Sequence, residues 1–237
     1  MEKLNNCIEL CLKNDTVIYS SNFYPLSQLK NLSCKDVKFE LKALNEESEK
    51  NIIAFYPKDF PKECIFFPVK FFKILKKSKF VSLEHKHYLG TILSLGIKRE
   101  VFGDLLIKNE ICYGIIIEDM FNFLKENLTK INTSPVEVIE IESDEIPKTE
   151  FKEFDIRVVS LRLDSVVAEL SNFSRVAAVN YIDLGNVQVN YKVEREKKAK
   201  INMGDVIIIR KIGKFIVCEE RGLSRKDKLK ILIKKFV

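Results

Sequence analysis

The stretch RLDSVVAELSNFSRVAAVNYIDLGNVQVN, residues 162–190, decides the fold of the last third of this 237-residue chain. Apolar residues recur at helical spacing over residues 162–170 and 174–184, which predicts two short helices. Ser174 suits the N-cap of the second helix, and Gly185 suits its end because glycine adopts a positive φ without steric cost. Short strands are predicted to follow, at 187–189, 206–210, 215–218 and 229–233. Two helices followed by hairpins indicate a small α+β domain at the C-terminus.

Further toward the N-terminus, residues 69–141 alternate between strand-like and helix-like patterns. The predicted order is strand (69–75), helix (83–95), strand (104–108), strand (111–117), helix (118–128) and strand (136–141). This βαββαβ order is typical of ferredoxin-like and RNA-recognition (RRM-like) folds. The third strand, 111–117, lacks the basic and aromatic residues on which RNA-recognition domains stack bases. Topology alone therefore does not predict RNA binding by this sheet.

The first 65 residues predict a small α/β domain with no catalytic motif. A helix is expected over 4–12, and strands are expected at 16–19, 37–41 and 51–56. Residues 143–156 are acidic and show no clear periodicity, so they are interpreted as a linker. The predicted α+β organisation has domains at 1–65, 66–142 and 157–237, joined at the last boundary by the acidic linker 143–156.

Composition excludes several classes of protein. Hydrophobic residues make up 46% and charged residues 31%, with 8 Gly and 6 Pro, which indicates a folded chain. No secretory signal opens the sequence, and the longest near-apolar run, 111–117, is far short of the roughly 20 residues that cross a bilayer. We therefore expect a cytoplasmic protein without a membrane partner.

The cysteines and histidines of the sequence do not have the spacing of a metal site or a redox pair. Six cysteines occur without a Cys-x-x-Cys pair, and they are predicted to be reduced thiols in the core. The two histidines, His85 and His87, are two residues apart and would not face each other on a helix. We predict no metal site and no cofactor.

Positive charge is concentrated in the last third of the chain. The whole chain has a net charge of +6, but residues 157–237 hold 18 basic and 9 acidic residues, whereas the preceding residues hold 22 and 25. This asymmetry indicates a polyanion-binding module attached to a nearly neutral body.

Two sets of motifs resemble known families. Residues 162–190, followed by GDVIII at 204–209, resemble the small RNA-binding domain named after ribosomal protein S-four, also called the alpha-L motif. The segment HKHYLGTILSLGIKREVFGDLLI, residues 85–107, placed before such a domain, is similar to the YlmH family. The resemblance implies binding to ribosomal RNA on the large ribosomal subunit, with a role in quality control or rescue of stalled subunits that carry peptidyl-tRNA. It also implies a link to cell division and leaves tRNA open as a partner. We expect a monomer when the protein is free.

Candidate RNA-binding residues lie in this last domain. Arg162 and Arg175 each open a predicted helix, where backbone N–H groups and a fixed positive charge suit phosphate; Arg162 could alternatively pair with Asp164. Ser174 and Asn190 are expected to shape the surface as a cap and a turn residue. The dense basic residues complete the candidate set: Lys192, Lys197, Lys198, Lys200, Arg210, Lys211 and Lys214.

A secondary RNA or partner surface is predicted at Lys86, Lys98 and Arg99, with Lys98 and Arg99 pointing outward; fold maintenance is the alternative for this segment. Three functions from different classes stay open. The leading one is a non-enzymatic RNA-binding protein, and the others are an RNA-modifying enzyme of the pseudouridine synthase or methyltransferase type and a cell-division interaction factor. The Arg-Leu-Asp triplet at 162–164 could be mistaken for the catalytic triplet of a synthase, but it lies within the S-four-like pattern. No glycine-rich loop follows a strand, so we predict no catalytic residues.

Overall fold

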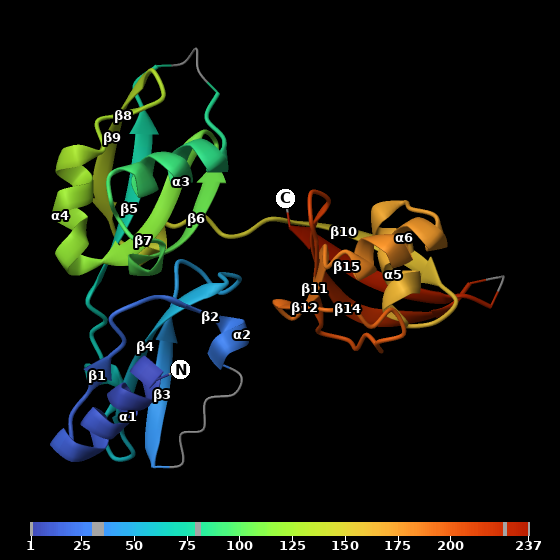
Figure 1. Cartoon of the computed structure of the whole chain (residues 1–237), viewed down its shortest axis with the longest axis horizontal. Coiled ribbons are helices and arrows are strands. Elements are labelled where there is room, and N and C mark those ends of the chain that lie inside the picture. Colours follow the sequence, from blue (N-terminus) through green and yellow to red (C-terminus); the bar gives the residue numbers. More distant parts are fainter. Residues whose placement is uncertain (1, 30–35, 79–81, 225–226, 237) are drawn as a thin grey trace. The chain divides into compact units, whose positions relative to one another are not determined.

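The computed structural model describes residues 2–29, 36–78, 82–224 and 227–236. The chain divides into two compact units, Met1–Lys148 and Thr149–Val237 (Figure 1). Each unit combines helices with antiparallel sheets, which is consistent with the predicted α+β class. No helix in these described ranges is long and apolar enough to span a membrane.

The first part of the N-terminal unit is a helix packed on a small sheet. Helix α1 (Glu2–Asn14) buries Leu4 and Cys11 against Ile53 and Phe55 of the central strand β4. Strands β1, β2 and β3 all pair antiparallel with β4. The remaining elements are β1 (Ile18–Tyr19), β2 (Tyr24–Pro25), α2 (Leu26–Leu29), β3 (Val37–Lys42), β4 (Lys50–Pro57) and η1 (Lys62–Cys64).

The second part of the N-terminal unit has the predicted order of elements. It comprises β5 (Val69–Lys76), α3 (His85–Ser94), η2 (Arg99–Val101), β6 (Phe102–Lys108), β7 (Ile111–Ile117), α4 (Glu118–Asn127), β8 (Lys130–Ile131) and β9 (Ser134–Ile141). The antiparallel sheet has the strand order β6-β7-β5-β9-β8. Asn109 and Glu110 both have positive φ (51° and 64°), as a two-residue hairpin turn requires. Helices α3 and α4 pack on one face, where Phe72, Tyr88 and Leu124 are fully buried.

The opposite face of this five-stranded sheet packs against the first part of the chain. Phe23, Leu44 and Ile52 share one apolar cluster with Phe71 and Ile115. The Phe23 amide donates to the Glu100 carbonyl at 2.6 Å, and the amides of Glu49 and Lys50 donate to Asp104 Oδ2 at 2.6 and 3.0 Å. Residues 1–65 and 66–142, predicted as separate domains, are thus parts of one unit.

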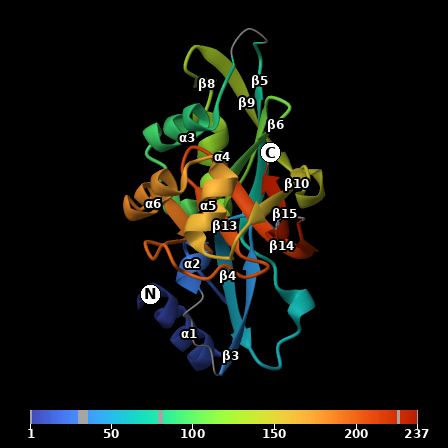
Figure 2. The same ribbon diagram turned by 90° about the vertical axis from the view of Figure 1, so that its right-hand side faces the viewer.

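The C-terminal unit is a six-stranded sheet with two helices on one face (Figure 2). Its elements are β10 (Phe151–Val158), α5 (Leu163–Ser171), α6 (Arg175–Asp183), β11 (Val187–Val189), β12 (Lys192–Val193), β13 (Val206–Ile209), β14 (Gly213–Leu223) and β15 (Leu229–Phe236). The strand order is β10-β15-β14-β13-β11-β12. Leu163, Val167 and Ile182 from the helices pack on Phe215 and Ile233 of the sheet. Gly185 has φ +73° after α6, as its predicted role as a helix stop requires.

The acidic linker predicted over 143–156 is wrong for most of its length. Residues 143–145 form a 3-10 turn, Ile146 is buried, and residues 151–156 lie in β10, which pairs with β15. The sequence did not reveal β10 as a strand because Glu153 and Asp155 make the segment look like an acidic linker. Both residues occupy the face of β10 opposite the core, where Lys234 and Lys230 pair with them at 3.3 and 3.0 Å. The predicted start of the last domain at residue 157 therefore moves toward the N-terminus.

The cysteines only partly fit the prediction of core thiols. The described cysteines are free thiols: Cys11 and Cys112 are buried, Cys7 and Cys218 are half-buried, and Cys64 is exposed. Burial raises the pKa of the Cys112 thiol. Cys34 lies outside the described residues.

Candidate RNA-binding surface

Two arginines and a buried aspartate organise the start of both helices of the C-terminal unit. Asp164, in the first turn of α5, has a side chain only 3% exposed. Arg162 donates to Asp164 Oδ1 from Nε at 3.1 Å and to Oδ2 from Nη2 at 2.8 Å. Arg175 donates to Asp164 Oδ2 from Nε and Nη2 at 3.3 and 3.1 Å. The pairing of Arg162 with Asp164, open at the level of sequence, is thus present and extends to Arg175.

This geometry sets the charge of the cluster. Burial by itself raises the pKa of Asp164, and the hydrogen bonds from Arg162 and Arg175 offset that effect, so the net pKa lies below its usual value. Asp164 therefore stays ionised at neutral pH and fixes the two guanidinium groups in place. Because the Arg162 and Arg175 side chains remain 36% and 62% exposed, they can still meet a phosphate.

The lysine-rich segment 197–200 runs beside the start of α5. The amide of Asp164 donates to the Lys197 carbonyl at 3.0 Å, and the amide of Leu163 donates to the Ala199 carbonyl at 2.9 Å. Arg162 and Lys200 form an isolated antiparallel bridge. The structure therefore brings together five predicted residues with exposed or half-exposed side chains, here called the α5 cluster: Arg162, Arg175, Lys197, Lys198 and Lys200.

Ser174 and Asn190 have structural roles. The Ser174 hydroxyl accepts a hydrogen bond from the Ala177 amide at 3.2 Å, which is the predicted N-cap. Asn190 has φ +50°, donates to Asp205 Oδ1 at 2.8 Å and accepts from the Val206 amide at 3.1 Å. Both side chains bond to the backbone and hold the local fold of the surface.

The remaining predicted residues lie away from the α5 cluster. Arg210 and Lys211 form the turn between β13 and β14, and the Tyr181 hydroxyl donates to the Arg210 carbonyl at 2.7 Å. Tyr181 is in the last turn of α6, six residues after Arg175, so this pair lies toward the opposite end of that helix, roughly 9 Å along its axis from Arg175. Lys192 is exposed in the edge strand β12, and Lys214 is half-buried on β14.

Arg195 is a structural residue that the sequence analysis missed. Its guanidinium Nη1 donates to the Asp183 carbonyl at the end of α6. It also lies against Gly185, where an added Cβ would be 2.8 Å from Arg195 Nη2. A cation at a helix C-terminus complements the unpaired carbonyls there. Within a run of basic residues, no local signal distinguished Arg195 from its neighbours.

The secondary surface predicted at Lys86, Lys98 and Arg99 does not assemble as expected. Arg99 turns inward: it donates from Nη1 to the Phe102 and Gly103 carbonyls at 2.9 Å each, and its guanidinium lies 4.6 Å from the centroid of the Phe102 ring. The prediction that Arg99 points outward is wrong, because backbone carbonyls and the Asp104 carboxylate lie within reach of its guanidinium. Lys86 pairs with Glu84 at 2.9 Å, and Lys98 is exposed. Fold maintenance, the alternative for this segment, applies to Arg99.

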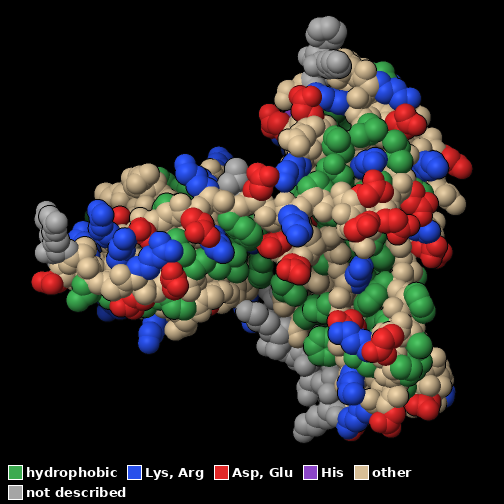
Figure 3. All heavy atoms as spheres, turned by 180° about the vertical axis from the view of Figure 1, so that it is seen from behind, with side chains coloured by type: hydrophobic (Ala, Val, Ile, Leu, Met, Phe, Trp, Pro, Cys, Tyr) green, Lys and Arg blue, Asp and Glu red, His purple; other side chains and the backbone are tan. Residues whose placement is uncertain are grey.

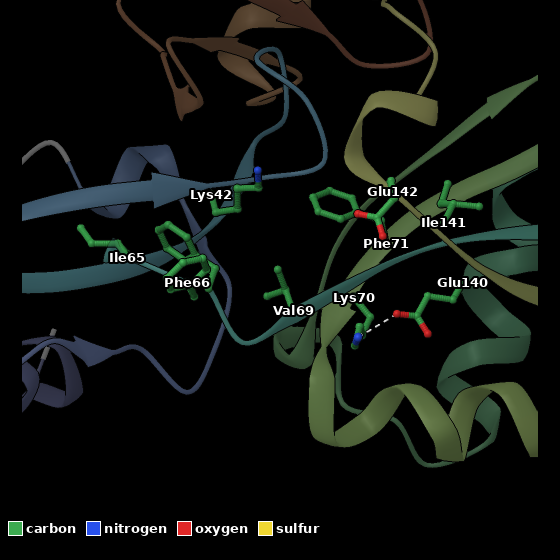
Figure 4. A pocket seen from close by; sticks show the side chains of 10 residues that line it. Lys42, Ile65, Phe66, Val69, Lys70, Phe71, Glu140, Ile141 and Glu142 are labelled. Carbon is green, nitrogen blue, oxygen red and sulfur yellow. Dashed lines mark ion pairs between the residues drawn. The ribbon is translucent and has the colours of Figure 1, made fainter. Parts of the chain in front are cut away.

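The basic residues of strand β5 are compensated by acidic neighbours. Lys70 borders a hollow of about 350 Å³ (Figure 4), and its Nζ lies 2.7 Å from Glu140 and 3.5 Å from Glu118. The other ion pairs along this strand and its end are Lys73 with Glu145, Lys76 with Glu110 and Lys77 with Glu137. Lys and Arg alternate with Asp and Glu over the N-terminal unit in Figure 3. Among the residues that the structure describes, no group of His, Cys, Asp and Glu could hold a metal ion.

Comparison with known proteins first defines the class of one segment. Residues 63–145 match the sequence model of a family described as "Putative RNA-binding domain in YlmH". The segment from β5 to β9 is therefore a YlmH-type RNA-binding domain, as the resemblance of residues 85–107 implied. The S-four-type domain at the C-terminus stays a prediction.

Two named proteins are similar to this chain over more than half of its length. It is 29% identical over 188 residues to "Ribosome-associated protein quality control protein P2" of Bacillus subtilis (strain 168), an alignment that covers 78% of this chain and 73% of that protein. It is also similar to the solved structure "Cell division protein ylmH from Streptococcus pneumoniae", with 23% identity and a TM-score of 0.47 over 62% of this chain and 92% of that one.

Proposed function

We propose that this chain is a non-enzymatic RNA-binding protein that acts in the cytoplasm on the large ribosomal subunit, in ribosome-associated quality control or rescue of stalled subunits that carry peptidyl-tRNA. Its C-terminal unit is an S-four-like domain, and ribosomal RNA is its main partner, with tRNA as a further one. The protein is a monomer when free.

The α5 cluster is the observation that carries this proposal. Five cationic residues lie at the first turns of α5 and α6 and in the segment beside them, and the Asp164 carboxylate is buried there and bound by two of them. Exposed lysines beside fixed guanidinium groups suit the phosphates of structured RNA, which proteins bind by shape and backbone contacts.

The homology supports the ribosomal setting. The YlmH-type domain at residues 63–145 carries an RNA-binding description, and the Bacillus subtilis relative is named for ribosome association and protein quality control. Because the lysines of β5 are ion-paired, we assign the main phosphate contacts to the C-terminal unit.

The competing functions fit the geometry less well. A synthase of the pseudouridine type would need an aspartate that reaches its substrate, whereas Asp164 is buried and holds two arginines. We therefore propose that the protein catalyses no reaction. A role as a cell-division interaction factor is the alternative. The following experiment distinguishes binding to ribosomal RNA from binding to a protein partner.

The test is co-sedimentation of the full chain with purified large and small ribosomal subunits. Lys197→Glu/Lys198→Glu/Lys200→Glu reverses three exposed charges while it leaves Asp164 and its two arginines in place. The matched control, Lys3→Glu/Lys13→Glu/Lys58→Glu, makes the same charge change at exposed positions of the N-terminal unit outside residues 63–145.

We expect the first triple variant to lose association with the large subunit and the control to retain it. The logarithm of the affinity should fall with the logarithm of the salt concentration, with a slope of about −0.7 to −0.9 for each phosphate contact. Equal binding by both variants, or affinity that does not respond to salt, would contradict the proposal and favour a protein partner.

A further inference from the structure

The sheet of the C-terminal unit has a second face, which the two helices do not cover. Alternate residues of each strand point to opposite faces. Phe154, Ile156, Phe215, Val217, Ile231 and Ile233 belong to the core with α5 and α6. The residues between them, including Phe151, Lys214, Lys234 and Phe236, therefore lie on the open face.

Three aromatic rings and two lysines form a row of successive contacts on this open face. The Phe151 and Phe236 rings meet edge to face with centroids 5.0 Å apart. Lys214 Nζ lies 4.5 Å from the Phe236 centroid and 4.9 Å from the Tyr191 centroid. At the other end, Lys234 Nζ lies 5.8 Å from the Phe151 centroid. We call Phe151, Tyr191, Lys214, Lys234 and Phe236 the ring row.

The acidic residues that β10 places on this face lie at the Phe151 and Lys234 end of the ring row. Asp155 binds Lys230 and Arg221, and Glu153 binds Lys234. The Lys214 ammonium lies between the Phe236 and Tyr191 rings and is the charged group of the ring row at that end. The three rings are half-buried, so part of each surface is open to a ligand.

We propose that the ring row binds unpaired nucleotides of RNA, whose bases stack on Phe151, Phe236 and Tyr191 while Lys214 contacts the phosphates. Stacking tolerates any base because each base has a π face, and cations along the path hold the backbone. From β10 through β15 to β14 the row crosses two inter-strand spacings, roughly 10 Å, and Tyr191 extends it from the turn between β11 and β12. Sheets that recognise single-stranded RNA stack two or three bases on such aromatic side chains.

This inference rests on the proposed function and adds a second contact to it. The α5 cluster would bind the phosphates of structured RNA, and the ring row would bind an unpaired segment. The two contacts can be separated with two probes: a ten-nucleotide oligouridine that carries one 2-aminopurine, and a blunt RNA duplex.

The test variant of the full chain is Phe151→Leu/Tyr191→Leu/Phe236→Leu, which keeps apolar bulk and removes the rings. Its control replaces two rings of the N-terminal unit outside residues 63–145, Phe39→Leu/Phe60→Leu. Thermal unfolding is recorded for each variant. Tyr191→Leu, at a turn between strands, is the second variant in case the triple substitution does not fold.

We expect the triple variant to bind the oligouridine at least tenfold more weakly, with loss of the 2-aminopurine fluorescence change, and Tyr191→Leu to bind it about fivefold more weakly. Affinity for the duplex should change less than twofold, and the control should match the parent. If the parent binds both probes and the ring variants bind the oligouridine as tightly as the parent does, the proposal for the ring row is wrong. The proposed function of the α5 cluster would not be affected. If the parent binds neither probe nor ribosomal subunits, the proposed function fails as well.

Discussion

Both units of this protein place two helices on one face of an antiparallel sheet, but they treat the other face differently. In the N-terminal unit the second face of the β6-β7-β5-β9-β8 sheet is packed against Phe23, Leu44 and Ile52 of the first part of the chain. In the C-terminal unit the second face carries the ring row, and its aromatic rings are half-buried. Sheet topology therefore does not tell which sheet can receive a ligand, because the answer depends on what packs on the face opposite the helices.

The two units also use their charges differently. Lysines of β5 are neutralised by nearby glutamates, whereas the α5 cluster arranges its cations around a carboxylate that is buried beneath them. A charged side chain contributes to a binding surface when its counter-ion leaves it accessible to the ligand. The domain with the RNA-binding description and the unit with the accessible cations thus occupy different parts of the chain.

The largest effect is expected when Asp164 loses both partners. Arg162→Ala/Arg175→Ala should destabilise the C-terminal unit by about 3–5 kcal/mol, since a buried carboxylate is left without a counter-ion. Urea unfolding measures the loss. Arg210→Ala/Lys211→Ala removes the same charge from an exposed turn and should stay within about 0.5 kcal/mol of the parent.

The same pair of variants has a defined pH dependence. Because the folded pKa of Asp164 is lowered, its stabilising contribution is full above the unfolded pKa, about 3.9, and is lost as pH falls through the folded pKa. In Arg162→Ala/Arg175→Ala this acid-side loss should disappear. A double variant as stable as its control would show that the arginines do not support Asp164.

The next effect tests the covered face of the N-terminal unit. A Cβ at Gly103 would lie 2.5 Å from Ile115 Cγ2 and 3.2 Å from Phe23 Cε1, between the sheet and the first part of the chain. Gly103→Ala should lower the stability of the N-terminal unit by about 1–3 kcal/mol through overpacking. Gly90→Ala on α3, where no atom lies within 4 Å of the new Cβ, should raise it by roughly 0.5–1 kcal/mol. Equal unfolding midpoints for both variants would rule out the close approach.

A smaller effect is expected from the cap of α6. Ser174→Ala removes the hydrogen bond to the Ala177 amide and should cost about 1 kcal/mol. For a unit of this size that loss lowers Tm by about 4–8 °C. Affinity for duplex RNA should change less than twofold, because the Ser174 hydroxyl is engaged by the Ala177 amide. If Ser174→Ala lowered the affinity for duplex RNA more than twofold while the unit stayed folded, Ser174 would be assigned a direct contact with RNA.

The smallest effect is expected on the N-terminal unit. Lys86→Gln/Lys98→Gln should change ribosome association less than twofold and stability by at most about 0.5 kcal/mol, since exposed ion pairs contribute little. Co-sedimentation and thermal unfolding measure the two quantities. If Lys86→Gln/Lys98→Gln lost ribosome association, the predicted secondary surface would be supported. Both units would then contribute to ribosome binding.

Local patterns in the sequence determined much of the secondary structure. The apolar periodicities placed the helices and most longer strands within a few residues, and Ser174 and Gly185 marked the limits of α6 as the structure has them. These signals depend on neighbours within one or two turns along the chain. The concentration of positive charge in the last third was equally legible from the sequence.

Tertiary structure decided what depends on pairing between distant strands. Strand β10 escaped detection because its acidic residues face partners on β15, about 80 positions later. Arg99 turned inward because the Phe102 and Gly103 carbonyls of β6 accept hydrogen bonds from its guanidinium, while Lys50 of the first part of the chain donates to its backbone carbonyl. The ring row draws side chains from residues 151, 191, 214, 234 and 236. Strand order and register set which of these side chains meet, and neither quantity is encoded in a local pattern of the sequence.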